Sequence, residues 1–228
     1  MFSPYTITER WPASNPDIIQ LYTVDTPNGL KVAAMLEETH IAYEKHLLSF
    51  RDDDQHSAEF LSLNPNNKIP AIIDPHGQDG MPLGLWESNA ILLYLAEKSG
   101  RFLPHDRHAR YETIQWLMWQ ASGPGVMFPQ FGFFFTKEGA EWEDKRPLQK
   151  YRKETKRLLT VLDQRLSDHT YIMGNDYSIA DIANWPWVRA LIRPYEAQQE
   201  LALDYYPHVR QWLNLCLERP ASVAVLHP

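Results

Sequence analysis

The stretch Leu21-Tyr22-Thr23-Val24-Asp25-Thr26-Pro27-Asn28-Gly29 separates two kinds of apolar pattern. The short apolar run over residues 18–22 is typical of a strand, and apolar residues recur with helical spacing from Leu30. The stretch therefore predicts a tight loop between a strand and a helix. A helix start presents backbone N–H groups and the positive end of its dipole, which suit an anion, including a thiolate. The same residues fit equally well a helix that Thr26 caps and that begins at Pro27.

The composition bounds what this chain can do. Its 228 residues are enough for one large domain or two small ones. Residues 1–16 contain polar residues and prolines where a signal peptide would need an apolar segment, and no apolar run is long enough to span a membrane. We therefore expect a cytoplasmic protein. The single cysteine, Cys216, excludes an internal disulfide and a C-x-x-C redox pair, so any thiol chemistry requires an imported thiol.

Charge and histidine spacing exclude several classes of partner. Residues 1–100 hold 6 Lys and Arg against 14 Asp and Glu, and the remaining residues hold 16 against 15. An acidic chain without a basic stripe disfavours nucleic acid, whose phosphates need clustered cations. The nine histidines form no metal-binding motif, and His105 with His108 is too little for a site. We expect no metal, no nucleic acid and no membrane.

The first hundred residues alternate between strand and helix patterns. Strand patterns cover residues 18–22, 42–50, 69–74 and 83–86, and helical patterns begin at Leu30, cover residues 58–63 and begin again at residues 87–89. This order predicts an α/β, thioredoxin-like domain over residues 18–101. The segment 1–17 before it has no periodicity and is expected to be an extended N-terminal arm lying on the protein or on a partner subunit.

Only helical spacing follows a linker marked by Pro104. Gly123-Pro124-Gly125 should kink or end a helix, and Ser178-Ile179-Ala180-Asp181 has the spacing of a capping box. Pro220 is expected to close the last helix. An all-α helical domain is thus predicted over residues 107–228. Its aromatic residues, including Trp116, Trp119 and those of the 128–135 run, fit a core, a subunit interface or an acceptor pocket equally well.

The order of these motifs resembles a cytosolic glutathione transferase. The resemblance covers about residues 18–220 and rests on the strand-turn-helix, Ile69-Pro70, Glu87-Ser88 and the 178–181 box together. Within that superfamily, Thr26-Pro27-Asn28-Gly29 and the stretches 66–72 and 87–98 are most similar to the Nu class. That class includes bacterial glutathione-dependent disulfide-bond oxidoreductases, and the yeast prion protein Ure2 is a more distant relative.

The resemblance implies a glutathione site, with glutathione as co-substrate rather than a bound cofactor. The Ile69–Pro70 bond is expected to be cis, so that the Ile69 backbone pairs with the cysteinyl backbone of glutathione. Ser88 can cap the following helix and receive the γ-glutamyl carboxylate, while Glu87 holds the α-amino group. A trans proline at a strand edge and an ordinary capped helix start remain the structural alternatives.

Further contacts to glutathione follow from the same resemblance. Lys68 can reach the glycyl carboxylate, although an exposed lysine is also ordinary. Gln55 matches a glutamine that contacts glutathione in Nu-class relatives. Those relatives often place an arginine near the start of a long helix of the second domain, where this sequence has Lys150. Arg146 or Arg152 could substitute for it.

The resemblance assigns the thiol end to Asn28 and Thr26 as the catalytic residues. Tyr22 is a second candidate, but it lies within the strand and its ring is expected to be packed. Thr26 occupies the position of the first active-site cysteine of a thioredoxin, so it can donate a hydrogen bond to sulfur but cannot form a disulfide. Cys216, with apolar neighbours on a helix, is expected to be an inert core thiol.

The resulting hypothesis is a homodimeric, glutathione-dependent thiol-disulfide oxidoreductase. Bound glutathione thiolate attacks a disulfide, and a second glutathione resolves the mixed disulfide. Two alternatives remain: a regulatory binding protein that keeps the transferase fold, and a detoxification transferase that conjugates hydrophobic electrophiles. Each predicts different turnover with a small disulfide and an aryl halide.

Overall fold

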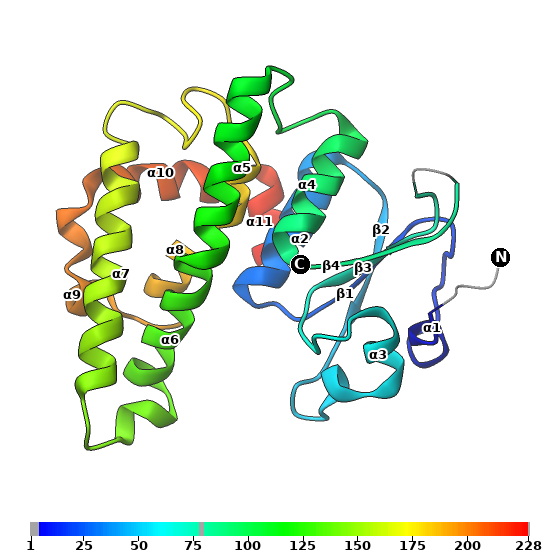
Figure 1. The fold of residues 1–228 in the computed structure, drawn as a ribbon, viewed down its shortest axis with the longest axis horizontal. Coiled ribbons are helices and arrows are strands. Elements are labelled where there is room, and N and C mark those ends of the chain that lie inside the picture. The colour runs from blue at the N-terminus through cyan, green and yellow to red at the C-terminus, as the bar shows by residue number, and fades with distance from the viewer. Residues whose placement is uncertain (1–4, 78–79, 228) are drawn as a thin grey trace. The chain divides into compact units, whose positions relative to one another are not determined.

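The computed structural model describes residues 5–77 and 80–227 (Figure 1). The chain divides into two compact units, one formed by Met1–Arg101 with Ala224–Pro228 and the other by Phe102–Val223. The first is an α/β unit and the second is built from helices. Each is described by itself below.

A four-stranded mixed sheet forms the centre of the first unit. The strands are β1 (Ile19–Thr23), β2 (Tyr43–Leu47), β3 (Ala71–Asp74) and β4 (Leu83–Trp86), in the order β2-β1-β3-β4. β1 runs parallel to β2 and antiparallel to β3, which is antiparallel to β4. All five residues of β1 and all four of β3 are buried, so both strands are covered on both faces of the sheet. The predicted strands are confirmed.

Helices cover both faces of this sheet. α2 (Pro27–Thr39) and α4 (Ser88–Ser99) pack together on one face, and α3 (Ala58–Leu63) lies on the other (Figure 1). Leu36 and Leu92, on α2 and α4, are fully buried with Leu21 and Ile72 of the sheet. Burying these leucine and isoleucine side chains stabilises the unit by about 2 kcal/mol each. The predicted thioredoxin-like domain is confirmed.

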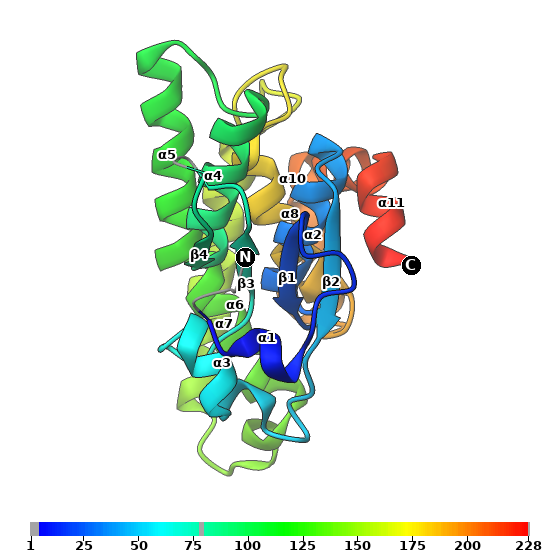
Figure 2. The same cartoon turned by 90° about the vertical axis from the view of Figure 1, so that its right-hand side faces the viewer.

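The described part of the N-terminal arm differs from the extended arm that we expected. Residues Ile7–Arg10 form one helical turn, α1, which packs against α3 (Figure 2). Ile7 is fully buried in an apolar cluster with Tyr22 and Phe60. One buried apolar side chain in an otherwise polar segment gives no periodicity, so the sequence carried no helical signal here. Residues 1–4 of the arm lie outside the described residues.

The second unit contains the long helices that the spacing predicted. They are α5 (Arg107–Ser122), α6 (Pro124–Thr136), α7 (Arg146–Arg165), α8 (Ile179–Ile192) and α10 (Pro207–Leu217). Short turns η2 (Glu138–Glu141), α9 (Gln198–Leu201) and η3 (Leu203–Tyr205) connect them. The break predicted at Gly123 is confirmed, because α5 ends before it and α6 begins at Pro124.

The capping box predicted at the start of α8 is also confirmed. Ser178 accepts from the Ala180 N–H at 3.2 Å, and Asp181 accepts from the Ser178 N–H at 2.9 Å. The Asp181 carboxylate, fully buried, also accepts from the indole N–H of Trp212 at 2.8 Å, which ties α8 to α10. Burial raises the pKa of Asp181.

The structure bears on two other expectations for the helical part of the chain. Pro220 does not close the helical region, because it begins a further helix, α11 (Pro220–Leu226); proline is as suited to the first turn of a helix as to its end. In the aromatic run, Phe128, Phe131 and Phe134 are buried within this unit and so serve as core.

No helix among residues 5–77 and 80–227 is long and apolar enough to cross a membrane. Within the same residues, no group of three or more His, Cys, Asp or Glu side chains is arranged to hold a metal ion.

Candidate functional site

The sheet register brings the three predicted motifs to one end of the first unit. Tyr22 of β1 pairs with Ala71 of β3, and Ala71 pairs with Trp86 of β4, so the three residues form one row across the sheet. Because these pairs are antiparallel, the end of β1, the start of β3 and the end of β4 lie at the same edge of the sheet. The loop to Thr26 and Asn28, the Ile69–Pro70 pair and the Glu87–Ser88 pair adjoin this row.

The chain turns sharply from β1 into α2. The Thr26 N–H donates to the Val24 carbonyl at 2.7 Å, and the Leu30 N–H donates to the Thr26 carbonyl at 2.9 Å, the first bond of the helix. Thr26 is extended (φ −99°, ψ 166°) and is the N-cap residue, but its side chain makes no capping hydrogen bond. The alternative that Thr26 serves through its side chain as the cap is therefore wrong, whereas Pro27 does begin the helix.

Gly29 permits this close approach of α2 to the end of β1. A Cβ at this position would lie 2.1 Å from the Val24 carbonyl oxygen and 2.3 Å from Thr23 Oγ1. Both distances are far inside van der Waals contact, and one of the atoms belongs to the backbone. Only glycine lets the first turn of α2 lie directly on the strand end.

The Ile69–Pro70 peptide bond is cis, as the resemblance implied. Both residues are buried just before β3. The loop that leads to them is held by Asn64, whose side-chain Nδ2 donates to the Lys68 carbonyl at 2.5 Å and whose Oδ1 accepts from the Asn66 N–H at 2.9 Å. The Lys68 residue itself is exposed.

Glu87 and Ser88 occupy different positions from those expected. Ser88 is the first residue of α4, not its cap, and the N-cap is Glu87, which makes no side-chain capping bond. Glu87 has φ 72° and ψ 108°, a conformation that costs a non-glycine residue about 1–3 kcal/mol. Strained backbone of this kind clusters at ligand sites, so it marks Glu87 independently of its sequence motif. Ser88 is buried, whereas the Glu87 side chain is exposed.

A buried lysine that the sequence did not single out lies behind this pair. Lys31, on α2, is 1% exposed, and its Nζ donates to Ser88 Oγ and to Asn89 Oδ1, each at 3.3 Å. Its only signal in the sequence is a lone lysine in the apolar run from Leu30 to Leu36. Burial lowers its pKa to about 7, against the opposing effect of the Glu87 carboxylate.

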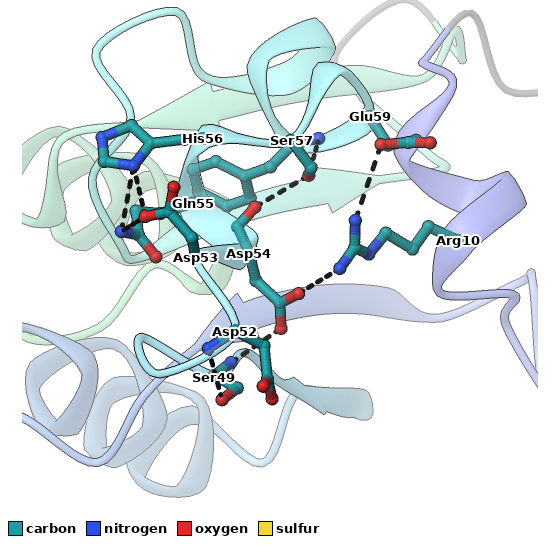
Figure 3. Close-up of polar contacts among 10 residues, drawn as sticks. Arg10, Ser49, Asp52, Asp53, Asp54, Gln55, His56, Ser57 and Glu59 are labelled. Atoms are coloured by element: carbon teal, nitrogen blue, oxygen red, sulfur yellow. Dashed lines mark hydrogen bonds and ion pairs between the residues drawn. The ribbon is translucent and has the colours of Figure 1, made fainter.

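Gln55 lies on the short turn η1 (Asp54–His56) in the loop after β2 (Figure 3). Its Nε2 donates to Asp53 Oδ1 at 2.9 Å and lies 3.2 Å from His56 Nδ1, which is 2.6 Å from the same Asp53 oxygen. Its Oε1 is buried and has no hydrogen-bond partner among the described residues. The amide nitrogen of Gln55 is thus held by the loop, and its amide oxygen is closed off from solvent.

The N-terminal arm holds the base of the same loop. Asp54 is 7% exposed; its carboxylate pairs with the Arg10 guanidinium and accepts from the Ser49 N–H at 2.8 Å (Figure 3). Ser57 then caps α3 by accepting from the Phe60 N–H at 3.2 Å. The loop that carries Gln55 is thus held at both ends, and the ion pair with Arg10 ties it to α1.

Tyr22 is packed, as expected, and does not face a site. Its ring is fully buried and stacks on His46, with 4.8 Å between ring centroids. Burial raises the pKa of its hydroxyl well above the ordinary range for tyrosine. Because the ring lies in the apolar cluster with Ile7 and Phe60, Tyr22 is not exposed to a ligand, and Thr26 and Asn28 remain the candidates for contact with a thiolate.

The second unit holds the remaining predicted contact residues. Lys150 is exposed on α7, with its Nζ 5.8 Å from the centroid of the Tyr151 ring. Arg146 makes a paired contact with Asp144, and Arg152 pairs with Glu200. Cys216 is fully buried on α10, as expected of a core thiol.

Comparison with known proteins identifies this arrangement. The family model for the glutathione S-transferase N-terminal domain matches residues 18–97, and the model for the C-terminal domain matches residues 124–220. The chain belongs to the glutathione S-transferase family. The predicted family and fold class are therefore confirmed.

Several relatives of this glutathione S-transferase cover almost its whole length. Disulfide-bond oxidoreductase YfcG of Escherichia coli (strain K12) is 44% identical over 206 residues, 90% of this chain and 93% of that protein. Disulfide-bond oxidoreductase YghU of the same organism is 41% identical over 211 residues, 89% of this chain and 72% of that protein.

A solved structure matches this transferase even more closely. A glutathione transferase family member from Pseudomonas fluorescens pf-5, with two glutathione bound, is 54% identical with a TM-score of 0.97, covering 98% of this chain and 99% of that one. A glutathione transferase from Pseudomonas putida, with one glutathione disulfide bound per subunit, is 52% identical with a TM-score of 0.96, covering 98% and 96%.

Proposed function

We propose that this transferase is a glutathione-dependent disulfide-bond reductase in which the thiolate of bound glutathione is the nucleophile. The observation that carries the proposal is the row Tyr22, Ala71 and Trp86, which brings the motifs of a glutathione site to one sheet end. The relatives named disulfide-bond oxidoreductases and the similar structures with bound glutathione or glutathione disulfide support it.

The tripeptide is held along its length by the residues that the resemblance assigned. The Ile69 backbone, before Pro70, pairs with the cysteinyl unit like a short added strand. Glu87 binds the α-amino group, and Ser88 with the N-terminus of α4 binds the γ-glutamyl carboxylate. The remaining contacts are assigned to Gln55, Lys68 and Lys150.

Asn28 and Thr26 act on the sulfur. The Asn28 amide and the Thr26 hydroxyl donate hydrogen bonds to the thiolate, which also lies at the positive end of the α2 dipole. Lowering a thiol pKa by one unit needs about 1.4 kcal/mol of preferential thiolate stabilisation, within the range of one or two such hydrogen bonds. A larger fraction of bound glutathione is then ionised at neutral pH.

The reaction is a pair of thiol-disulfide exchanges. The bound thiolate attacks one sulfur of a disulfide, forming a mixed disulfide with glutathione and releasing the other half as a thiolate. A second glutathione thiolate attacks the glutathione sulfur of the mixed disulfide, which yields glutathione disulfide and releases the remaining half. Two glutathione molecules are oxidised for each disulfide reduced, and the protein forms no covalent intermediate.

The working form that we propose is a cytoplasmic homodimer. The dimer follows from the resemblance to the family, and exposed apolar side chains at the end of β2 and just after it support it: Leu47 is 58% exposed and Phe50 is 50% exposed. Apolar side chains at such exposure are common at subunit interfaces.

The test is turnover of a small mixed disulfide with glutathione, measured as glutathione disulfide formed, for the natural protein and for Asn28→Ala. We expect activity in the natural protein and a fall in kcat of about tenfold in Asn28→Ala, with glutathione affinity changed much less. Cys216→Ala is the matched control and should keep full activity, because the only cysteine takes no covalent part.

Three results contradict the proposal. Equal activity of Asn28→Ala and the natural protein would remove the role of Asn28. Absence of disulfide reduction at every glutathione concentration, with glutathione still bound, would favour a regulatory binding protein. Faster turnover of an aryl halide than of the disulfide would favour a conjugating transferase.

A further inference from the structure

We propose that Lys31 is a positioning residue for the γ-glutamyl carboxylate of glutathione: it turns the Ser88 hydroxyl toward that carboxylate and supplies the buried positive charge behind it. The inference rests on the proposed function and assigns a residue on α2 to the recognition of the γ-glutamyl end of glutathione.

The geometry joins the two helices of the site. Lys31 lies on α2, five residues after Thr26, and its side chain reaches the first two residues of α4. Its Nζ is 3.3 Å from Ser88 Oγ and 3.3 Å from Asn89 Oδ1, and both residues are only 9% exposed. The ammonium therefore lies directly behind the N-terminus of α4, where the helix dipole already favours an anion.

The hydrogen bond from Lys31 determines what Ser88 can do. A serine hydroxyl has one donor and two acceptor sites, and an ammonium has donors only. Because Ser88 Oγ accepts from Lys31, its own O–H is left to donate, and the neighbouring charge polarises it as a donor. A donor at this point suits a carboxylate rather than an ammonium or an amide N–H.

A purely structural role explains Lys31 less well. Burying a lysine costs free energy, and an apolar side chain of similar volume would join α2 to α4 as well or better. Burial lowers the pKa of Lys31 to about 7, while the nearby Glu87 carboxylate opposes that shift. Without ligand the charge is held weakly, and an incoming carboxylate would favour the charged form.

These charges indicate which residues bind each charged part of the γ-glutamyl group. Glu87, exposed and negative, suits the α-amino group, whereas Lys31 and Ser88 suit the α-carboxylate. A site built in this way should discriminate strongly against a tripeptide that lacks the carboxylate, because the buried ammonium would then lose the anion that it helps to bind.

The experiment combines a protein variant with a ligand analogue. Binding of glutathione and of 4-aminobutanoyl-Cys-Gly, which lacks only the α-carboxylate, is measured by titration calorimetry for the natural protein and for Lys31→Met. We expect Lys31→Met to weaken the binding of glutathione about tenfold to hundredfold, the range for a charge-assisted hydrogen bond. The affinity for the analogue should stay unchanged. Lys153→Met, which removes an exposed lysine of α7, is the matched control and should change neither affinity.

Lys31→Gln guards against a folding defect of the methionine variant. It keeps donors near Ser88 but removes the charge, so it should lose glutathione affinity and again spare the analogue. Equal losses of affinity for both ligands in the folded variants, or no loss for either, would overturn the role of Lys31 while the proposed function stands. Failure of the natural protein to bind glutathione would overturn both.

Discussion

Single residues at the end of the sheet determine how closely the elements of the site approach one another. Gly29 lets α2 begin against the Val24 carbonyl, and the φ of 72° at Glu87 sets the direction in which the chain enters α4. Lys31 then links α2 to Ser88. Each is a local departure from ordinary sequence preference, and departures of this kind are typical of ligand sites.

Gly29→Ala should displace the start of α2. The added Cβ would meet the Val24 carbonyl oxygen at 2.1 Å, and a backbone atom cannot move aside without moving the strand end. We expect the free energy of unfolding to fall by about 1–3 kcal/mol in urea titrations. Thr23→Ala in the same background should restore little, because it removes only the Thr23 Oγ1 contact. A Gly29→Ala protein as stable as the natural one would contradict this close approach.

The pH dependence of stability should report the burial of Lys31. Its pKa is about 7 in the folded protein, against the ordinary lysine value of 10.5 in the unfolded chain. Between these values the unfolded chain binds a proton that the folded chain lacks. The free energy of unfolding of the natural protein should therefore rise with pH across this window relative to Lys31→Met, by about 1 kcal/mol per pH unit. Urea titrations of both proteins at several pH values measure the difference.

A difference in unfolding free energy that stays constant from neutral to alkaline pH would contradict the lowered pKa. A difference that instead falls with rising pH would mean that the folded protein holds the Lys31 proton more tightly than the unfolded chain does.

At the scale of elements, the N-terminal turn α1 fixes the loop that carries Gln55. Arg10 of α1 pairs with the nearly buried carboxylate of Asp54, which also accepts from the Ser49 N–H (Figure 3). No pattern in the sequence connects residue 10 with residue 54. The arm thereby contributes to the order of a loop that the proposed site uses.

Arg10→Met should loosen this loop. The Asp54 carboxylate would lose its cation, but the Arg10 side chain is 39% exposed, so screening limits the expected loss of stability to about 1 kcal/mol or less. The local effect is larger: the Ser49 amide should exchange hydrogen faster, as mass spectrometry of peptides from the loop can measure. Arg157→Met, which removes an exposed pair with Glu154, is the control and should leave this exchange unchanged. Unchanged exchange in Arg10→Met would contradict the role of the arm.

Elements with clear apolar periodicity could be predicted from the sequence, and those without it could not. The apolar runs of β1 and β3 and the capping box of α8 carried their own signal. The turn α1 depends on one buried side chain, Ile7, and a proline such as Pro220 marks a helix start and a helix end alike. The positions of the motifs could be predicted from their order along the chain. The burial of Lys31 could not, because it results from the packing of α2 on α4.

At the scale of the whole molecule, the proposed homodimer should be visible as mass. The chain has a mass of 26.6 kDa, and sedimentation should give twice that value at micromolar concentration. Because Phe50 is half exposed, Phe50→Asp should shift the protein toward the single-chain mass if this face forms the interface. A single-chain mass for the natural protein at all concentrations would contradict the dimer.

The whole account depends on activation of glutathione by the start of α2. The most direct measurement is the pKa of the thiol of glutathione bound to the protein, followed by the ultraviolet absorbance of the thiolate as pH is raised, for the natural protein and Asn28→Ala. We predict that the bound thiol has a pKa at least about one unit below that of free glutathione, and that Asn28→Ala removes most of this difference. A bound thiol that ionises at the same pH as free glutathione, in a protein that still reduces disulfides, would contradict the account.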